Sequence, residues 1–302
     1  MSDLTQYLQP AILSKVDNLE LIAKFIVEGF LIGLHRSPYH GFSVEFSSYR
    51  KYEPGDELKF IDWRVFGRTD KYYVKQFEET TNLNCYLVMD ISASMDYAGP
   101  DGRSGTVSKL RYASFLNAGL AYMMLRQGDA VGLVGVNAGT FDFIPSSSKS
   151  NWLMQLLSRM SQLKPAGETG LGRGLSLLAE RVKGRSLIII TSDLLVPPND
   201  LLEALSYFRY KNHEVIIFHV LTDTELKFPF TRQTNFVDME TGKEIITESA
   251  YIREEYKRLL GAHVETLKRG CRDVNVDFLS LSTSDDLGSA LMTYMAKRAE
   301  YF

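Results

Sequence analysis

The hydrophobic and polar positions along the chain predict two parts of different character. Residues 12–34 carry apolar side chains at helical spacing, which predicts an amphipathic helix. Residues 41–49 then alternate between apolar and polar side chains, and residues 72–77 form a second strand-like run. The first part, residues 1–82, is therefore predicted to hold one helix and a small β-rich segment.

The second part, residues 83–302, alternates short apolar runs with helical patterns. The apolar runs, interpreted as buried strands, are residues 85–89, 130–136, 187–190, 215–221 and 276–281. The helical patterns are residues 109–127, 150–163, 171–183, 200–211, 250–270 and 285–299. This alternation predicts an α/β fold in which helices cover both faces of a mainly parallel sheet. A short run at residues 141–144 predicts an edge strand that folds back on its predecessor.

Residues 228–247 interrupt this alternation. The segment Asp238–Gly242 has the composition of a tight turn between two strand-like runs, so an inserted hairpin is expected. The aromatic side chains of this segment are Phe228, Phe230 and Phe236. Two interpretations of them stay open: they anchor a protein partner on an exposed surface, or they pack inward on the following helix.

Composition excludes several classes of function. Lys and Arg total 34 against 37 for Asp and Glu, and this near-neutral balance predicts no broad nucleic-acid footprint. The longest apolar run, residues 118–125, is far shorter than the roughly 18 residues that would suggest a membrane span. The first residues lack the basic region of a secretory signal. Cys85 and Cys271 lie in or beside apolar segments and are expected to be buried thiols of a cytoplasmic protein.

Oxygen-bearing side chains follow two of the predicted strands. Asp90, Ser92 and Ser94 come directly after the first strand of the second part, and Asp193 follows the fourth main strand. Thr169, between glycines, lies just before a predicted helix. In a doubly wound sheet of order 3-2-1-4-5-6, strands 1 and 4 are neighbours, and ligands bind beyond their carboxyl ends. Because Mg²⁺ prefers oxygen ligands, the five residues form a candidate metal site; alternatively, each is a loop or capping residue.

The spacing Asp90-x-Ser92-x-Ser94, with Thr169 and Asp193, resembles the metal-ion-dependent adhesion site of von Willebrand factor type A domains. This resemblance implies that Ser92 and Ser94 bind the ion directly, and that Thr169 does so directly or through water. Asp90 and Asp193 would act mainly through waters. One coordination position is then left for a Glu or Asp of a protein partner, which the ion (Mg²⁺, or else Mn²⁺ or Ca²⁺) attracts.

Two blocks in the first part, Tyr52–Asp56 and Ile61–Arg64, resemble the signature of the bacterial domain of unknown function 58 family. The resemblance covers nearly the whole chain. It implies a type A-like domain over residues 83–302 with the hairpin inserted at about 228–247, preceded by residues 1–82 with the signature. It also implies a partnership with a MoxR-type AAA+ ATPase in assembling or remodelling a complex.

The expected function is thus that of a non-enzymatic, metal-dependent protein-interaction module. One alternative is a Mg²⁺-dependent phosphatase with Asp90 as nucleophile, although such enzymes carry a second Asp where Ser92 stands here. Another is a metal-independent scaffold that binds through its N-terminal block. Nucleotide binding is not supported, because the glycine-rich loop at residues 167–174 fails both phosphate-binding patterns. The histidines lack zinc spacing.

Overall fold

The computed structural model describes residues 9–16, 18–34, 49–51, 73–75, 83–100, 107–288 and 290–292. Contacts divide the chain into two compact units, Met1–Leu34 with Leu83–Phe302, and His35–Asn82. In the second unit, β1 (Tyr49–Lys51) pairs with β2 (Tyr73–Lys75) in a two-stranded antiparallel sheet.

Several elements predicted from the sequence lie outside the described residues. The signature blocks at residues 52–56 and 61–64 lie outside the described residues, as does the strand expected at residues 41–49 except for Tyr49. So does most of the last predicted helix, residues 285–299. The division into residues 1–82 and 83–302 stays a prediction.

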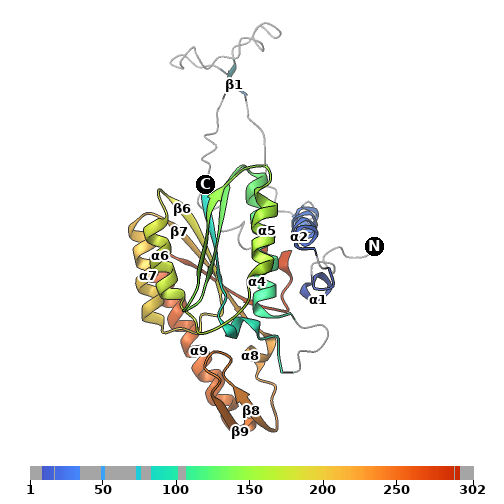
Figure 1. Ribbon diagram of the computed structural model, residues 1–302, viewed down its shortest axis with the longest axis vertical. Coiled ribbons are helices and arrows are strands. Elements are labelled where there is room, and N and C mark those ends of the chain that lie inside the picture. Colours follow the sequence, from blue (N-terminus) through green and yellow to red (C-terminus); the bar gives the residue numbers. More distant parts are fainter. Residues whose placement is uncertain are drawn as a thin grey trace. The chain divides into compact units, whose positions relative to one another are not determined.

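A six-stranded sheet forms the centre of the first unit (Figure 1). Its strands are β3 (Asn84–Asp90), β4 (Ala130–Val136), β5 (Phe141–Ser147), β6 (Ser186–Ser192), β7 (Glu214–Leu221) and β10 (Asp277–Ser282). Their order is β10-β7-β6-β3-β4-β5, and all pairs are parallel except β4 with β5. Numbered along the chain, this is the order 3-2-1-4-5-6 with an edge strand folding back, as predicted. The doubly wound, von Willebrand factor type A-like α/β fold is therefore confirmed.

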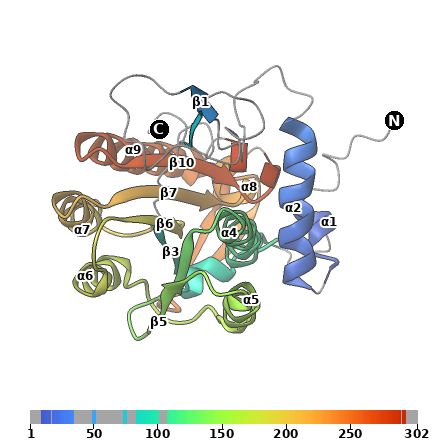
Figure 2. The same ribbon diagram turned by 90° about the horizontal axis from the view of Figure 1, so that it is seen from above.

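Helices cover both faces of this sheet, as Figure 2 shows from above. On one face lie α2 (Leu19–Leu34), α4 (Lys109–Arg126) and α5 (Trp152–Gln162). On the other lie α6 (Leu171–Arg181), α7 (Pro198–Tyr210) and α9 (Ser249–Asp273). Among the described residues, no helix combines the length and apolar character needed to cross a bilayer.

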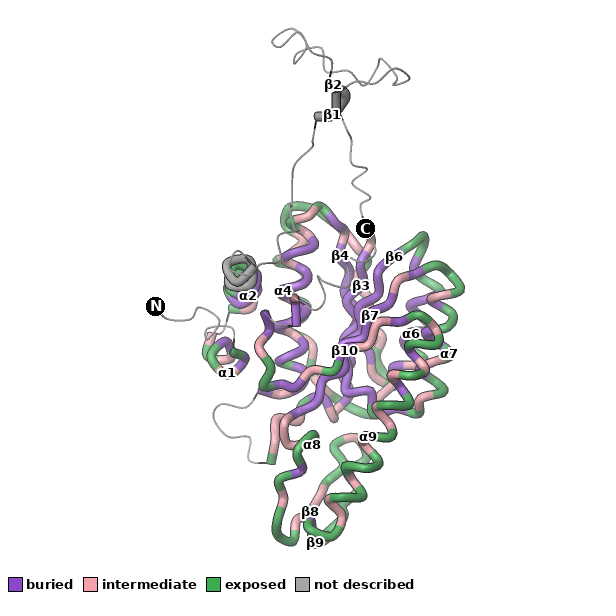
Figure 3. Tube along the Cα trace, turned by 180° about the vertical axis from the view of Figure 1, so that it is seen from behind, coloured by how far each residue is buried: buried purple, intermediate pink, exposed green. Residues whose placement is uncertain are grey.

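Alternating side chains of each central strand divide the core into two clusters. In β3, Leu87 and Met89 join the cluster under α4, whereas Tyr86 and Val88 join the cluster under α6 and α7. Because successive side chains of a strand point to opposite faces, a strand covered on both sides is apolar throughout. The four central strands, β3, β4, β6 and β7, are accordingly buried along most of their length (Figure 3), which explains their continuous apolar runs in the sequence.

The predicted N-terminal helix is two helices, so the expectation of one continuous helix over residues 12–34 was wrong. The first is α1 (Pro10–Leu13), and α2 follows after a break. Asn18 causes the break, because its side-chain oxygen accepts hydrogen bonds from the backbone N–H groups of Glu20 (2.9 Å) and Leu21 (3.2 Å). A side chain that caps the first turn in this way begins a new helix.

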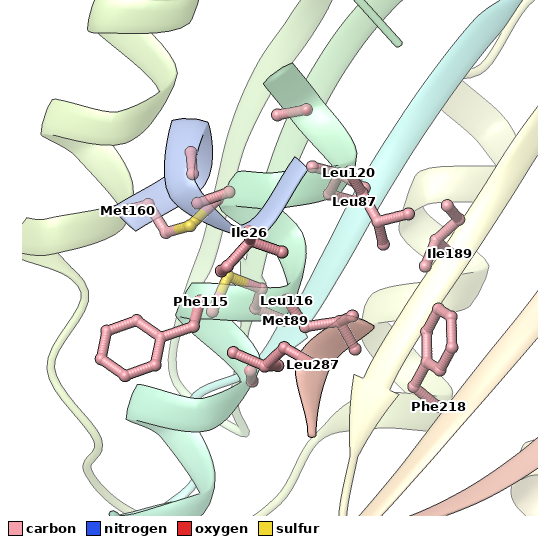
Figure 4. Close-up of a cluster of buried hydrophobic side chains, with 14 of the residues drawn as sticks. Ile26, Leu87, Met89, Phe115, Leu116, Leu120, Met160, Ile189, Phe218 and Leu287 are labelled. Atoms are coloured by element: carbon pink, nitrogen blue, oxygen red, sulfur yellow. The ribbon is translucent and has the colours of Figure 1, made fainter. Parts of the chain in front are cut away.

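The apolar face of α2 is buried within the first unit. Ile22 and Ile26 are 1 % and 0 % exposed, and both belong to the core cluster that contains Leu87 of β3 and Leu116 of α4 (Figure 4). A β-carbon at Gly119 of α4 would lie 3.2 Å from Ile26 Cγ2, so the glycine permits the close approach of the two helices. Helix α4 is therefore covered by the sheet on one side and by α2 on the other.

The inserted hairpin is present and its aromatic side chains pack on one another. It consists of β8 (Gln233–Val237) and β9 (Glu244–Glu248), paired antiparallel after the short helix α8 (Asp223–Lys227). The ring of Phe228 lies 4.5 Å from that of Tyr256 in α9, and Phe230 lies 5.1 Å from both Phe228 and Phe236. Phe228 is only 4 % exposed. Of the two interpretations given to these aromatics, the structure supports packing.

We expect Phe230→Ser to lower the free energy of unfolding by about 2–4 kcal/mol, because it removes a ring from a packed aromatic cluster. Urea unfolding measures this loss. Ile246→Ser on the same hairpin is the matched control, since Ile246 is 66 % exposed and should tolerate the change. Unchanged stability of Phe230→Ser would contradict the packing interpretation.

Candidate metal centre

Asp90 is the last residue of β3, and the chain turns sharply after it. The short 3₁₀ helix η3 (Ala93–Asp96) follows, with Ser92 as its N-cap. The backbone N–H of Ser92 donates to Asp90 Oδ1 at 2.9 Å, and the hydroxyls of Ser92 and Ser94 lie 3.1 Å apart. The turn thus gathers the three side chains of the Asp-x-Ser-x-Ser pattern at the carboxyl end of the central strand.

Asp193 directly follows β6, which pairs in parallel with β3. Ser192, just before it, donates its hydroxyl hydrogen to Asp90 Oδ2 at 2.6 Å. Each oxygen of Asp90 therefore accepts a hydrogen bond. Asp90 and Asp193 are each 1 % exposed. Burial and the neighbouring Asp193 raise the pKa of the Asp90 carboxyl above its usual value, because two buried negative charges disfavour one another.

The loop that carries Thr169 lies against the turn after β3. The N–H of Ala93 donates to the carbonyl of Gly167 at 2.9 Å, and the N–H of Ala166 donates to the carbonyl of Ile91 at 2.9 Å. Gly170 begins α6 where a β-carbon would come within 2.6 Å of the backbone nitrogen of Ala138. Only glycine fits there without displacing backbone, so Gly170 permits the loop of Thr169 to pass close to the backbone of Ala138.

Lys109 and Glu225 also belong to the site, although the sequence did not indicate them. Lys109 Nζ lies 2.7 Å from Asp193 Oδ2 and 2.6 Å from Glu225 Oε1, and the lysine side chain is 1 % exposed. Burial lowers the pKa of the Lys109 ammonium, but the two carboxylates outweigh burial and raise it above its ordinary value. The lysine is therefore charged and shared between Asp193 and Glu225.

Two further contacts fix these groups in place. Glu225 is held by a capping box, in which its Oε2 accepts from the N–H of Thr222 at 2.7 Å and from the Thr222 hydroxyl at 2.9 Å. His219 Nε2 donates to the backbone carbonyl of Asp193 at 3.0 Å. Burial lowers the pKa of His219 to about 4, so its imidazole is neutral. His219 is thus a buried, neutral residue of β7.

The hairpin also reaches this site. Glu240, in the turn between β8 and β9, accepts a hydrogen bond at its Oε2 from the backbone N–H of Thr169 at 3.0 Å. Its other oxygen, Oε1, and the hydroxyl of Thr169 are both buried, and neither has a hydrogen-bond partner among the described residues. Buried polar atoms are normally paired. A cation or a hydrogen-bond donor near these two oxygens would supply the missing partner.

The residues present fit a divalent cation. The site holds three carboxylates, those of Asp90, Asp193 and Glu225, and one ammonium, that of Lys109. Negative charge is therefore in excess among largely buried side chains. The unpaired hydroxyl of Thr169 offers an oxygen to a hard cation. The described residues hold no cluster of three or more His, Cys, Asp or Glu side chains arranged for a metal, so a cation here depends on hydroxyl ligands.

A pocket of about 470 Å³ lies between the site and the hairpin. Its polar lining includes Ser94, Lys109 and Glu225, and its apolar lining includes Phe228 and Phe236. Figure 1 shows the hairpin of β8 and β9 near η3 and α8, beyond the carboxyl ends of the strands. The hairpin therefore supplies one wall of the pocket that opens beside the candidate metal ligands.

A family model described as "Protein of unknown function DUF58" matches residues 48–266. The chain belongs to the DUF58 family. One relative with a similar sequence is Uncharacterized protein Rv1480 of Mycobacterium tuberculosis. It is 28 % identical over 299 residues, and the alignment covers 96 % of this chain and 90 % of the relative. Uncharacterized protein Mb1516 of Mycobacterium bovis matches to the same extent.

Two solved structures also resemble this DUF58 member. The conserved hypothetical protein BatB from Bacteroides thetaiotaomicron superposes with a TM-score of 0.48 at 16 % identity, covering 72 % of this chain and 99 % of BatB. The SpRpn10 VWA domain superposes with a TM-score of 0.41 at 13 % identity, covering 70 % of this chain and 94 % of that domain.

Proposed function

We propose that this DUF58 protein is a non-enzymatic interaction module whose binding of a protein partner depends on a divalent cation, Mg²⁺ first among the candidates. Asp90, Ser92, Ser94, Thr169 and Asp193 would hold the ion. The observation that carries the proposal is the buried Thr169 hydroxyl without a hydrogen-bond partner among the described residues. Two buried aspartates at the ends of the neighbouring strands β3 and β6 support it. When bound, the ion supplies concentrated positive charge for a carboxylate of the partner.

The environment of Asp90 supports an interaction role over phosphatase chemistry. An aspartate nucleophile must be accessible to its substrate. Here both oxygens of Asp90 accept hydrogen bonds, from the Ser92 N–H and the Ser192 hydroxyl, and the side chain is 1 % exposed. Lys109 does not provide a neutral amine either, because its ammonium is paired with two carboxylates.

The pocket beside the site indicates the chemistry of the partner. Ser94 is one of its polar lining residues, and Phe228 and Phe236 are among its apolar ones. A partner segment with an acidic side chain next to an apolar one would match both the polar and the apolar lining of this pocket. The family resemblance implies a MoxR-type AAA+ ATPase as the partner, with this protein acting in the assembly or remodelling of a complex. We propose that the ATPase presents such a segment to the pocket.

We expect the double substitution Ser92→Ala with Ser94→Ala to abolish metal-dependent binding to a MoxR-type ATPase of the same organism while the fold is kept. The two hydroxyls lie 3.1 Å apart and the Ser92 side chain also interacts with Asp90, but their removal deletes little buried apolar area. Surface-immobilised ATPase, titrated in Mg²⁺ and again in excess EDTA, measures the interaction.

The matched control is Ser176→Ala with Ser206→Ala, two exposed serines on α6 and α7 whose hydroxyls donate to backbone carbonyls of their own helices. This control should bind as the wild type does in Mg²⁺ and lose binding in EDTA. Equal binding of wild type in Mg²⁺ and EDTA would instead support the metal-independent scaffold.

A further inference from the structure

The tip of the inserted hairpin is a closed turn that presents Glu240 in a defined direction. Asp238 Oδ1 accepts from the N–H of Glu240 at 2.9 Å, and the N–H of Gly242 donates to the carbonyl of Asp238 at 2.8 Å. Gly242 has a φ of +71°, a left-handed conformation that favours glycine. These contacts lie within the turn itself, so they leave the carboxylate of Glu240 free to reach outward.

That carboxylate reaches a residue of the candidate metal centre. Thr169 and Glu240 are 71 positions apart, and the N–H of Thr169 donates to Glu240 Oε2 at 3.0 Å. The hydrogen bond occupies one carboxylate oxygen and leaves the other, Oε1, buried without a hydrogen-bond partner. The same holds for the hydroxyl of Thr169. A buried carboxylate oxygen without a partner is costly, and a cation bound to both residues would satisfy the two oxygens together.

We propose that Glu240 is an internal ligand of the metal centre, which takes the position that a carboxylate of the protein partner would otherwise fill. This inference rests on the proposed function, because it needs the cation there. It makes the hairpin a competitor of the partner: an acidic segment of the partner enters only when Glu240 leaves the ion and Thr169. The affinity for the partner then depends on how much more strongly the partner's carboxylate binds the ion than the carboxylate of Glu240 does.

The base of the hairpin is packed through contacts that do not involve Glu240. At the base, the Ser249 hydroxyl donates to the carbonyl of Arg232 at 2.8 Å, and the Phe228 ring packs on Tyr256. Near the tip, Ile245 and Ile246 are 65 % and 66 % exposed. The Thr169–Glu240 hydrogen bond joins the tip to the α6 loop. Release of Glu240 therefore leaves the aromatic base packed.

The test uses Mn²⁺ alone as the probe, because bound Mn²⁺ reports the number of water molecules on it through the relaxation of water protons. Glu240→Ala should bind Mn²⁺ about tenfold more weakly than the wild type. It should also raise the relaxation rate per bound ion, since water replaces the lost carboxylate. Glu240→Gln keeps an acceptor for the Thr169 N–H, so it controls for a loss of Mn²⁺ binding that is caused by misfolding. It should also bind Mn²⁺ more weakly than the wild type.

Hydrogen exchange gives a third measurement, after Mn²⁺ affinity and water relaxation. Added Mg²⁺ should slow amide exchange in residues 238–243 of the wild type and leave it unchanged in Glu240→Ala. The matched control is Glu244→Ala, which removes the same charge from the same hairpin at a glutamate that contacts Asn235. This control should behave as the wild type in all three measurements.

The outcomes separate this inference from the proposed function. If wild type binds no Mn²⁺, both are overturned. If wild type binds Mn²⁺ but Glu240→Ala matches it in affinity, water relaxation and exchange, the metal centre stands and the internal ligand is overturned. Equal effects of Glu240→Ala and Glu244→Ala would also overturn the internal ligand, since they would reflect only the charge of the hairpin.

Discussion

Replacing Asp90 by alanine is expected to reduce the affinity for Mg²⁺ about 100-fold or more, as measured by titration calorimetry. The substitution removes one of the three carboxylates that make the site negative, and it also removes the acceptor that orients Ser92 and Ser192. Groups that orient metal ligands typically contribute about 10–100-fold to affinity, and the lost charge adds to that effect.

The matched control for this experiment is Asp96→Ala. Asp96 lies in the same turn, η3, but it is exposed. Its removal should leave the Mg²⁺ titration unchanged. Circular dichroism confirms that each variant is folded before titration. Equal Mg²⁺ affinity in wild type and Asp90→Ala would remove the metal centre as proposed.

Replacing Lys109 by methionine is expected to lower the free energy of unfolding by about 3–5 kcal/mol in the absence of divalent ions. Methionine keeps much of the volume of the lysine stem, so little packing is lost. The cost arises because Asp193 and Glu225 lose their shared ammonium while they stay in place, and Asp193 is 1 % exposed. Denaturation in urea with EDTA measures the loss.

Lys227→Met is the control for this prediction. Lys227 also pairs with an aspartate, Asp223, but the lysine side chain is 69 % exposed, and exposed pairs contribute only about 0–1 kcal/mol. Mg²⁺ should recover more stability in Lys109→Met than in wild type, because it replaces part of the lost positive charge. A loss in Lys109→Met as small as that in Lys227→Met would show that the buried pair contributes little.

The sheet could be predicted from the sequence because its strands are buried on both faces. A run such as Leu187–Ile190 has no polar face, and it lies between helical patterns, so it indicates a central parallel strand. The strand order follows from the topology of doubly wound sheets. The same rule places Asp90 and Asp193 at the ends of neighbouring strands, where the structure has them.

The ionic partners of the site could not be predicted, because no local pattern links them. Lys109 and Glu225 are separated by 116 positions. Lys109 begins α4 and Glu225 lies in α8, so only the folded chain brings them together. Thr222 and Glu225 do carry a capping-box signal, but that pattern predicts only the start of a helix. The break before α2 was missed for a related reason: the apolar spacing continues across residues 14–18, while one asparagine restarts the helix.

The strand order also bears on how the protein is made. During synthesis β3 leaves the ribosome before the other strands of the main sheet, β4 and β5 add in turn on one side of it, and β6, β7 and β10 add in turn on the other. Each new strand joins an existing edge, and none must insert between two strands already paired. At about 5–20 residues per second, translation is slow compared with the pairing of neighbouring segments. The nascent sheet can therefore grow outward from its centre in the order of translation.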